Sequence, residues 1–208
     1  MAFFLLAGIP TFMSMLVAAP YNLMPSQIGL TNLPLFIVGL FSGPFFGWLS
    51  DVSVNVMARH NGTNRGMAEP EFRLVLLLLT TPMAMAGLIG LGESFQHELP
   101  LPWVLGWMTI TNIGGVAVVQ IAMAYLIDCY PQHSAQAFSS VNTISAGVVT
   151  VGITPAITWL GHAGPSVVFG SLSSAAAIVR GFALPMYVFG KRIRAWYECT
   201  QWAQRLLD

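Results

Sequence analysis

Long apolar stretches separated by short polar connections dominate the chain. Six such stretches occupy residues 1–20, 34–50, 74–92, 101–127, 137–160 and 166–189. A helix needs about 20 residues (range ~17–25) to cross a ~30 Å hydrocarbon core. The pattern therefore predicts an all-α membrane protein with six transmembrane helices, in a domain over residues 1–194 that is followed by a cytoplasmic tail over residues 195–208.

Composition supports a membrane protein and excludes several soluble classes. Only 8% of the 208 residues are charged and 55% are hydrophobic, whereas soluble domains are near 25% charged. The net charge of zero leaves no basic footprint for nucleic acid. The two cysteines, Cys129 and Cys199, are too few for a disulfide scaffold or a zinc site. We expect neither a metal nor another cofactor.

The placement of the charges predicts the orientation. Fifteen of the sixteen charged residues lie outside the six stretches. Basic residues occur in the segment 51–73 and after residue 190, but not in the connections 21–33, 93–100 and 161–165. The positive-inside rule then puts both chain ends in the cytoplasm, and we expect the plasma membrane as the location.

The first stretch, residues 1–20, has one alternative interpretation. Val17, Ala18 and Ala19 resemble a signal-peptidase site, but a signal peptide needs a basic region before its apolar core. The first charged residue here is Asp51. We therefore expect a transmembrane helix rather than a cleaved signal.

Two helix faces carry small or polar residues. Gly39, Gly43 and Gly47 repeat every four residues in the second stretch, which is the small-residue pattern of a helix–helix seam; a substrate contact is the alternative. In the fifth stretch, Thr143 and Thr150 belong to one hydroxyl-rich face, which either packs inward or lines a wet cavity.

Three polar side chains inside the stretches are candidates for solute contact or for hydrogen bonds between helices. Asn112 and Gln120 lie about 80° apart on the fourth helix and can both donate and accept. Arg180 is the one charged residue inside a stretch, roughly 14 Å from its cytoplasmic end and near the midplane. Intramembrane arginines usually face inward, are paired and are functional; snorkelling to the interface is the alternative.

Several segments resemble the major facilitator superfamily. The sequence from Gly47 to Asp51 is similar to the start of that family's cytoplasmic loop signature. Residues 20–34, 59–74, 125–131 and 185–194 resemble, in order, segments of the C-terminal half of fungal drug:proton-antiporter-like members. At Ser145 and Ala146 the family usually has a basic residue and an Asn, and often a Glu at Gln136; this chain departs from that pattern.

The resemblance implies one six-helix half of a transporter, built as a 3+3 inverted repeat. It implies transport of a small organic solute by alternating access, with a second six-helix half or a homodimer as the partner. In the family the loop that starts at Asp51 acts as a conformational latch, so Asp51 is expected to reach a helix absent from this chain. Arg59, Arg65 and Arg73 then serve the latch, or only the topology.

Two other functional classes were considered. A transport-inactive interaction protein, or a gene remnant, could dimerise through the glycine seam. An intramembrane enzyme needs clustered histidines, carboxylates or nucleophiles inside the membrane, whereas the four histidines all lie in connections. We therefore expect no enzymatic activity.

Overall fold

The computed structural model describes residues 21, 23–60, 72–129, 133–181, 185 and 187. Every regular element in this part of the chain is a helix, which confirms the all-α prediction. The helices are α2 (Pro25–Thr31), α3 (Leu33–His60), α4 (Phe72–Gln96), α5 (Leu101–Cys129), α6 (Ser134–Ala163) and α7 (Pro165–Gly181). The predicted span 1–20 and the tail 195–208 lie outside the described residues.

Two boundaries differ from the hydrophobic pattern. Helix α3 continues to His60, ten residues past the predicted end at residue 50, and α2 forms within the predicted connection 21–33. Hydropathy marks only the part of a helix that lipid surrounds. A helix satisfies its own backbone hydrogen bonds, so it can continue into water where Asp51 and Arg59 begin to appear.

Three described stretches are long and apolar enough to cross a membrane: Ser26–Arg59, Phe72–Gln96 and Leu101–Cys129. Helix α6, with 30 residues, exceeds the length that a span needs, and 17 residues of α7 are described. The other predicted spans, and their arrangement as a 3+3 inverted repeat, stay predictions.

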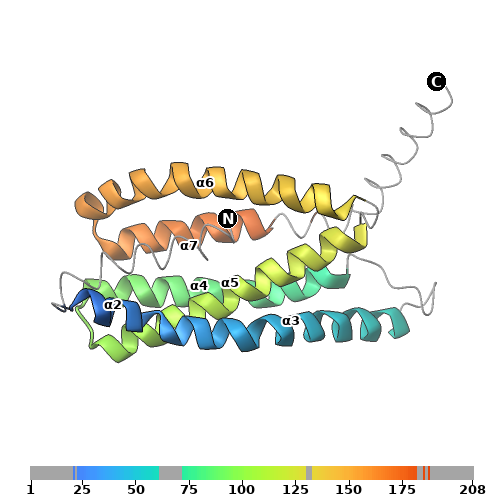
Figure 1. Ribbon diagram of the computed structural model, residues 1–208, viewed down its shortest axis with the longest axis horizontal. Coiled ribbons are helices and arrows are strands. Elements are labelled where there is room, and N and C mark those ends of the chain that lie inside the picture. The colour runs from blue at the N-terminus through green and yellow to red at the C-terminus, as the bar shows by residue number, and fades with distance from the viewer. Residues whose placement is uncertain are drawn as a thin grey trace, which may run out of the picture.

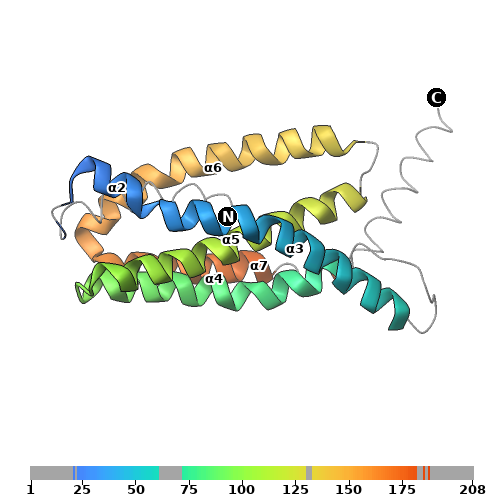
Figure 2. The same ribbon diagram turned by 60° about the horizontal axis from the view of Figure 1, so that its bottom comes forward.

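The long helices run antiparallel to their neighbours in sequence and form a bundle (Figure 1). Helix α5 packs between α3 and α4, and α4 packs between α5 and α7. Helix α6 makes few contacts with α5 and α7, and it stands apart from α3 and α4 in a second view (Figure 2). The end of α3, the start of α4 and the end of α5 lie towards the same end of the bundle (Figure 1).

The closest helix contact in the described bundle joins α4 to α5. A Cβ atom added to Gly114 would lie 2.6 Å from the Cβ of Ala84, and one added to Gly87 would lie 2.7 Å from the backbone N of Thr111. These two glycines therefore let the backbones approach to a distance that side chains would forbid. Small residues of this kind are how membrane helices gain packing contacts.

Apolar side chains fill the space around that contact. Leu88, Leu91, Val104 and Met108 are fully buried between α4 and α5, and Phe169 joins them from α7. A second cluster on the same two helices includes Leu77 and Ile121. The α4–α5 pair is thus the core of the described bundle, with α3 and α7 added on either side.

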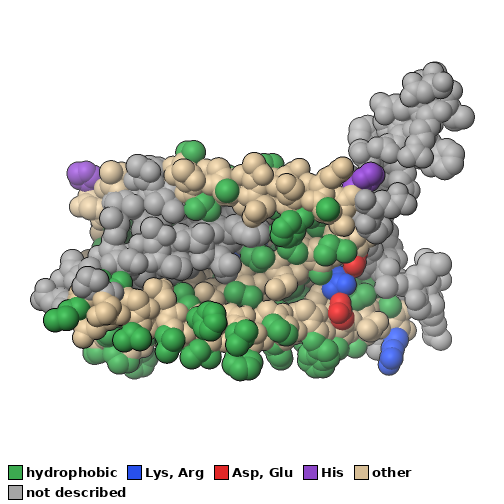
Figure 3. All heavy atoms as spheres, viewed as in Figure 1, with side chains coloured by type: hydrophobic (Ala, Val, Ile, Leu, Met, Phe, Trp, Pro, Cys, Tyr) green, Lys and Arg blue, Asp and Glu red, His purple; other side chains and the backbone are tan. Residues whose placement is uncertain are grey.

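On the face seen in Figure 3, apolar side chains line the lower part of the bundle, and the visible described acidic and basic side chains lie towards one end. Along α4, 20 residues separate Arg73 from Glu93, which corresponds to about 30 Å of helix. This length matches the hydrocarbon core of a bilayer. Arg73 and Glu93 therefore lie where a membrane would end.

Candidate functional site

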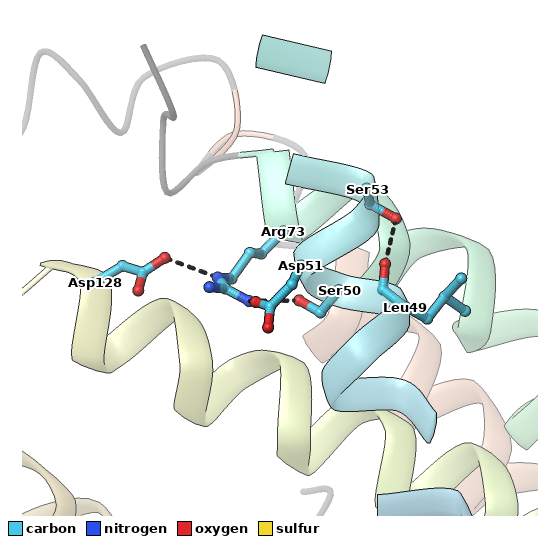
Figure 4. A network of polar contacts seen from close by, with 6 residues as sticks. All are labelled: Leu49, Ser50, Asp51, Ser53, Arg73 and Asp128. Carbon is cyan, nitrogen blue, oxygen red and sulfur yellow. Dashed lines mark hydrogen bonds and ion pairs between the residues drawn. The ribbon is translucent and has the colours of Figure 1, made fainter. Parts of the chain in front are cut away.

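A polar network at one end of the bundle is centred on Arg73. Its Nε donates to Asp128 Oδ2 at 2.7 Å, and its Nη1 donates to Asp51 Oδ1 and to Ser50 Oγ, both at 2.8 Å (Figure 4). Arg73 begins α4, Ser50 and Asp51 belong to α3, and Asp128 lies near the end of α5. One guanidinium thus ties three helices together.

The network is asymmetric in burial and charge. The Arg73 side chain is 12% exposed, against 34% for Asp128 and 65% for Asp51. Bonds between charged donors and acceptors are strong, but solvent screens exposed pairs. Arg73 and Asp128 therefore form the better-shielded pair. One cation facing two carboxylates leaves the network with a net charge of −1, concentrated at the exposed Asp51.

The four latch candidates, Asp51, Arg59, Arg65 and Arg73, do not form one cluster in the described structure. The structure brings Asp51 and Arg73 together. Arg59 is exposed on the last turn of α3, and Arg65 lies outside the described residues. Asp51 was expected to reach a helix absent from this chain, yet its described partner is Arg73 within the same bundle.

Asp128 and Ser50, which no sequence pattern singles out, both accept hydrogen bonds from Arg73. A signal was available for Asp128, which is the single acidic residue of the connection 128–136. By alternation, that connection shares a membrane side with Arg73. Charge complementarity across that side could have paired the two residues.

The solute candidates of α5 lie at different degrees of burial. Asn112 is half-buried, and its Oδ1 has no hydrogen-bond partner among the described residues. Gln120 is exposed, and its Nε2 lies 3.4 Å from where a Cβ on Gly43 would be. Both side chains thus keep hydrogen-bonding capacity, and the structure does not bring them into contact with each other.

The threonines of α6 bond their own helix. The Thr143 hydroxyl donates to the carbonyl of Ser139, and the Thr150 hydroxyl to that of Ala146, each at 2.9 Å. Both side chains are exposed, so this face does not pack against another described helix. Each hydroxyl oxygen can still accept a hydrogen bond from another group.

Arg180 is buried in α7, with 5% of its surface exposed. None of its three guanidinium nitrogens has a hydrogen-bond partner among the described residues. It shares a buried stripe with Ser173 and Ala176, and the Ser173 hydroxyl lies 3.5 Å from the Met85 carbonyl oxygen of α4. The side chain therefore does not snorkel out of the bundle.

The predicted glycine seam makes little contact inside the described chain. No described atom lies within 4 Å of a Cβ added to Gly39 or Gly47, and Gly43 meets only Gln120. The close approach occurs instead at Gly87 and Gly114. The role of the α3 glycines in packing stays a prediction about contacts outside the described structure.

The opposite end of the bundle has weaker polar contacts. The Tyr21 hydroxyl donates to the Leu99 carbonyl, and Nε2 of His97, the residue that follows α4, lies 3.4 Å from Oε2 of Glu93. Burial raises the pKa of Tyr21, and the negative charge of Glu98 raises it further. Among the described residues no group of histidine, cysteine and carboxylate side chains could hold a metal ion.

Known proteins similar to this chain include fungal transporters. Protein HOL1 of Saccharomyces cerevisiae is 30% identical over 177 residues, and an MFS-type transporter of Schizosaccharomyces pombe, named as uncharacterized, is 28% identical over 181 residues. The MFS transporter cpaT of Aspergillus oryzae is 29% identical over 187 residues. These matches cover 85%, 86% and 84% of this chain, respectively.

The same matches cover only 30%, 30% and 34% of the relatives, so the chain spans about a third of their length. No family model and no solved structure matches the chain. Two of the three relatives are named as MFS transporters. Over the shared region, the chain is thus similar to fungal MFS-type transporters.

Proposed function

We propose that the chain forms one six-helix part of a secondary transporter and, with a second part, moves a small organic solute by alternating access. The observation that carries this proposal is the similarity to MFS-type transporters over 84–86% of the chain, together with their greater length. Such transporters place the solute site near the midplane between two halves. A second six-helix half, or a second copy of this chain, would complete that site.

The Arg73 network is the proposed latch of this transporter. Arg73, Asp51 and Asp128 hold the ends of three helices together, so rearranging them would let α3 move relative to α4 and α5. Asp51 is mostly exposed and carries the excess negative charge, which suits it to bond a donor on the second half in one conformation. The exposed Arg59 then serves topology rather than the latch.

The proposed solute path follows α5 and α6. Asn112 and Gln120 offer both donors and acceptors, and Thr143 and Thr150 offer acceptor oxygens on an exposed helix face. Uncharged hydrogen-bonding groups of this kind suit a polar organic solute. We further propose, from the positive-inside rule, that the Arg73 end faces the cytoplasm, that both termini are cytoplasmic and that the membrane is the plasma membrane.

A flux measurement tests the proposal. The 208-residue chain is reconstituted into proteoliposomes, alone and together with the separately expressed N-terminal portion of cpaT, and challenged with labelled organic cations, anions and neutral solutes. We expect saturable flux only when both parts are present, and its loss with Asp51→Asn. Arg59→Gln is the matched surface control. Absence of flux for every solute class with both parts correctly inserted would reject the proposal.

A second candidate function is a membrane-embedded assembly protein that dimerises through Gly39, Gly43 and Gly47. The open space next to Gly39 and Gly47 in the described structure favours it, because a second helix could approach there. Cross-linking of the chain in bilayers would give a homodimer that Gly43→Ile abolishes, whereas Gly170→Ile on α7 would leave it intact. A dimer insensitive to Gly43→Ile excludes this seam as the interface.

A further inference from the structure

The buried guanidinium of Arg180 has no hydrogen-bond acceptor among the described residues. Its side chain is almost wholly buried, and all three guanidinium nitrogens lack a hydrogen-bond partner among the described residues. An unpaired charge in an apolar interior costs several kcal/mol. Such a residue is therefore expected to have an anionic partner.

The depth of Arg180 follows from the register of α7 against α4. These helices run antiparallel, and Ser173 lies opposite Met85. Seven residues further along α7 is Arg180, and seven residues back along α4 is Leu78. Leu78 is five residues from Arg73, so Arg180 lies about 8 Å deeper than the Arg73 network. This is shallower than the midplane position that the sequence suggested.

No described carboxylate is available at that depth. Asp51 and Asp128 are bonded to Arg73 at the end of the bundle. Glu93 lies at the opposite end of α4, beside His97, and Glu98 follows α4 there. Near Leu78 on α4, Thr80 and Thr81 donate their hydroxyl protons to the Leu77 carbonyl. The interface thus offers a cation with a fixed position and no anion of its own.

We propose that Arg180 is the centre of an oxyanion-binding site between α4 and α7. A guanidinium presents paired N–H groups that match two oxygens of a carboxylate or phosphate. The phosphate of an anionic lipid and the acidic group of a solute share this chemistry. Where the solute supplies the oxyanion, the site rests on the proposed transport function; where a lipid supplies it, the site is independent of transport.

The test measures anion-dependent stability of the full 208-residue chain in maltoside micelles. One arm adds inorganic phosphate or benzoate against a chloride control of equal ionic strength, and the other adds phosphatidylglycerol. An anion at 100 times its Kd should raise Tm by on the order of 5 °C. A response in the first arm assigns a soluble oxyanion, and a response in the second assigns a lipid phosphate.

Variants decide whether Arg180 carries the response. Arg180→Gln should melt at or above the wild-type temperature without anion, because it removes a buried unpaired charge, and should lose the anion response. Arg180→Lys keeps the charge without the planar fork, so its half-saturating concentration should rise several-fold. Arg59→Gln, which removes an exposed arginine, should respond like the wild type.

Stabilisation of Arg180→Gln equal to that of the wild type, or no stabilisation in either arm, overturns the proposal. If Arg180→Gln does not fold, the dose response of Arg180→Lys against the wild type decides, and an unchanged dose response counts against the site. The readout needs no transport. Arg180-dependent binding without flux would therefore leave this inference standing and reject the proposed function.

Discussion

At the scale of single residues, the partly buried Arg73 and the buried Arg180 have opposite electrostatic surroundings. Arg73 is surrounded by three oxygen acceptors from two other helices, whereas Arg180 has none within the described chain. Both arginines lie in apolar helices, and by helix register their depths along the bundle axis differ by about 8 Å. The same side-chain type is thus a structural hub in one position and an unpaired cation in the other.

Replacing Arg73 by Gln should destabilise the bundle. The change removes two ion pairs and leaves Asp51 and Asp128 facing each other without a cation. We expect a loss of about 2 kcal/mol, or on the order of 4–8 °C in Tm for a chain of this length. Arg59→Gln, at an exposed position, should shift Tm by much less. Equal shifts for the two variants in a thermal melt would contradict the hub role of Arg73.

The two carboxylates of the network should not be equivalent. Asp128 is about half as exposed as Asp51 (34% against 65%), so solvent screens its bond to Arg73 less. We expect Asp128→Asn to lower Tm more than Asp51→Asn, and added salt to diminish the Asp51 effect first. The reverse order, measured in the same detergent and salt series, would show that exposure does not rank these pairs.

At the scale of elements, close approach of α4 and α5 organises the bundle, and its glycines were not singled out from sequence. A Cβ atom added to Gly87 or Gly114 would lie closer to the facing helix than ordinary van der Waals contact allows. The spacing of glycines indicates a helix face that can pack closely, but it does not indicate which other helix packs there. Gly39, Gly43 and Gly47 show the more regular pattern, yet Gly39 and Gly47 have no described neighbour.

Adding one methyl group should therefore have opposite effects at different glycines. Gly114→Ala forces the α4 and α5 backbones apart, and overpacking of this kind typically lowers the free energy of unfolding by roughly 1–3 kcal/mol. Gly106→Ala on the same helix meets nothing within 4 Å in the described structure and should be neutral or slightly stabilising, since Ala favours helix more than Gly. Thermal melts that rank Gly106→Ala as the worse variant would contradict this helix contact.

At the scale of the whole molecule, the long apolar stretches indicate where helices lie but not which helices contact one another. The bounds of α4 and α5 agree with the predicted spans to within a few residues, because charged or polar residues such as Arg73, Glu93 and Asp128 mark their ends. The pairing of Asp128 with Arg73 requires two helices to meet although the two residues are 55 positions apart in the sequence. Contacts of that range follow from tertiary packing, which the apolar pattern of one helix does not encode.

The orientation of the bundle gives a prediction for the whole chain. The antiparallel order puts His97 and His133 at opposite ends of α5, and the positive-inside rule predicts that the His133 end faces the cytoplasm. In a variant with Cys129 and Cys199 replaced by Ser, a cysteine at position 97 should react with an impermeant maleimide on intact cells. A cysteine at position 133, or at 59 as the control on the same side, should react only after permeabilisation. Labelling of positions 97 and 133 from one side would mean that α5 does not cross the membrane, and labelling in the opposite sense would mean that the basic residues do not set the orientation.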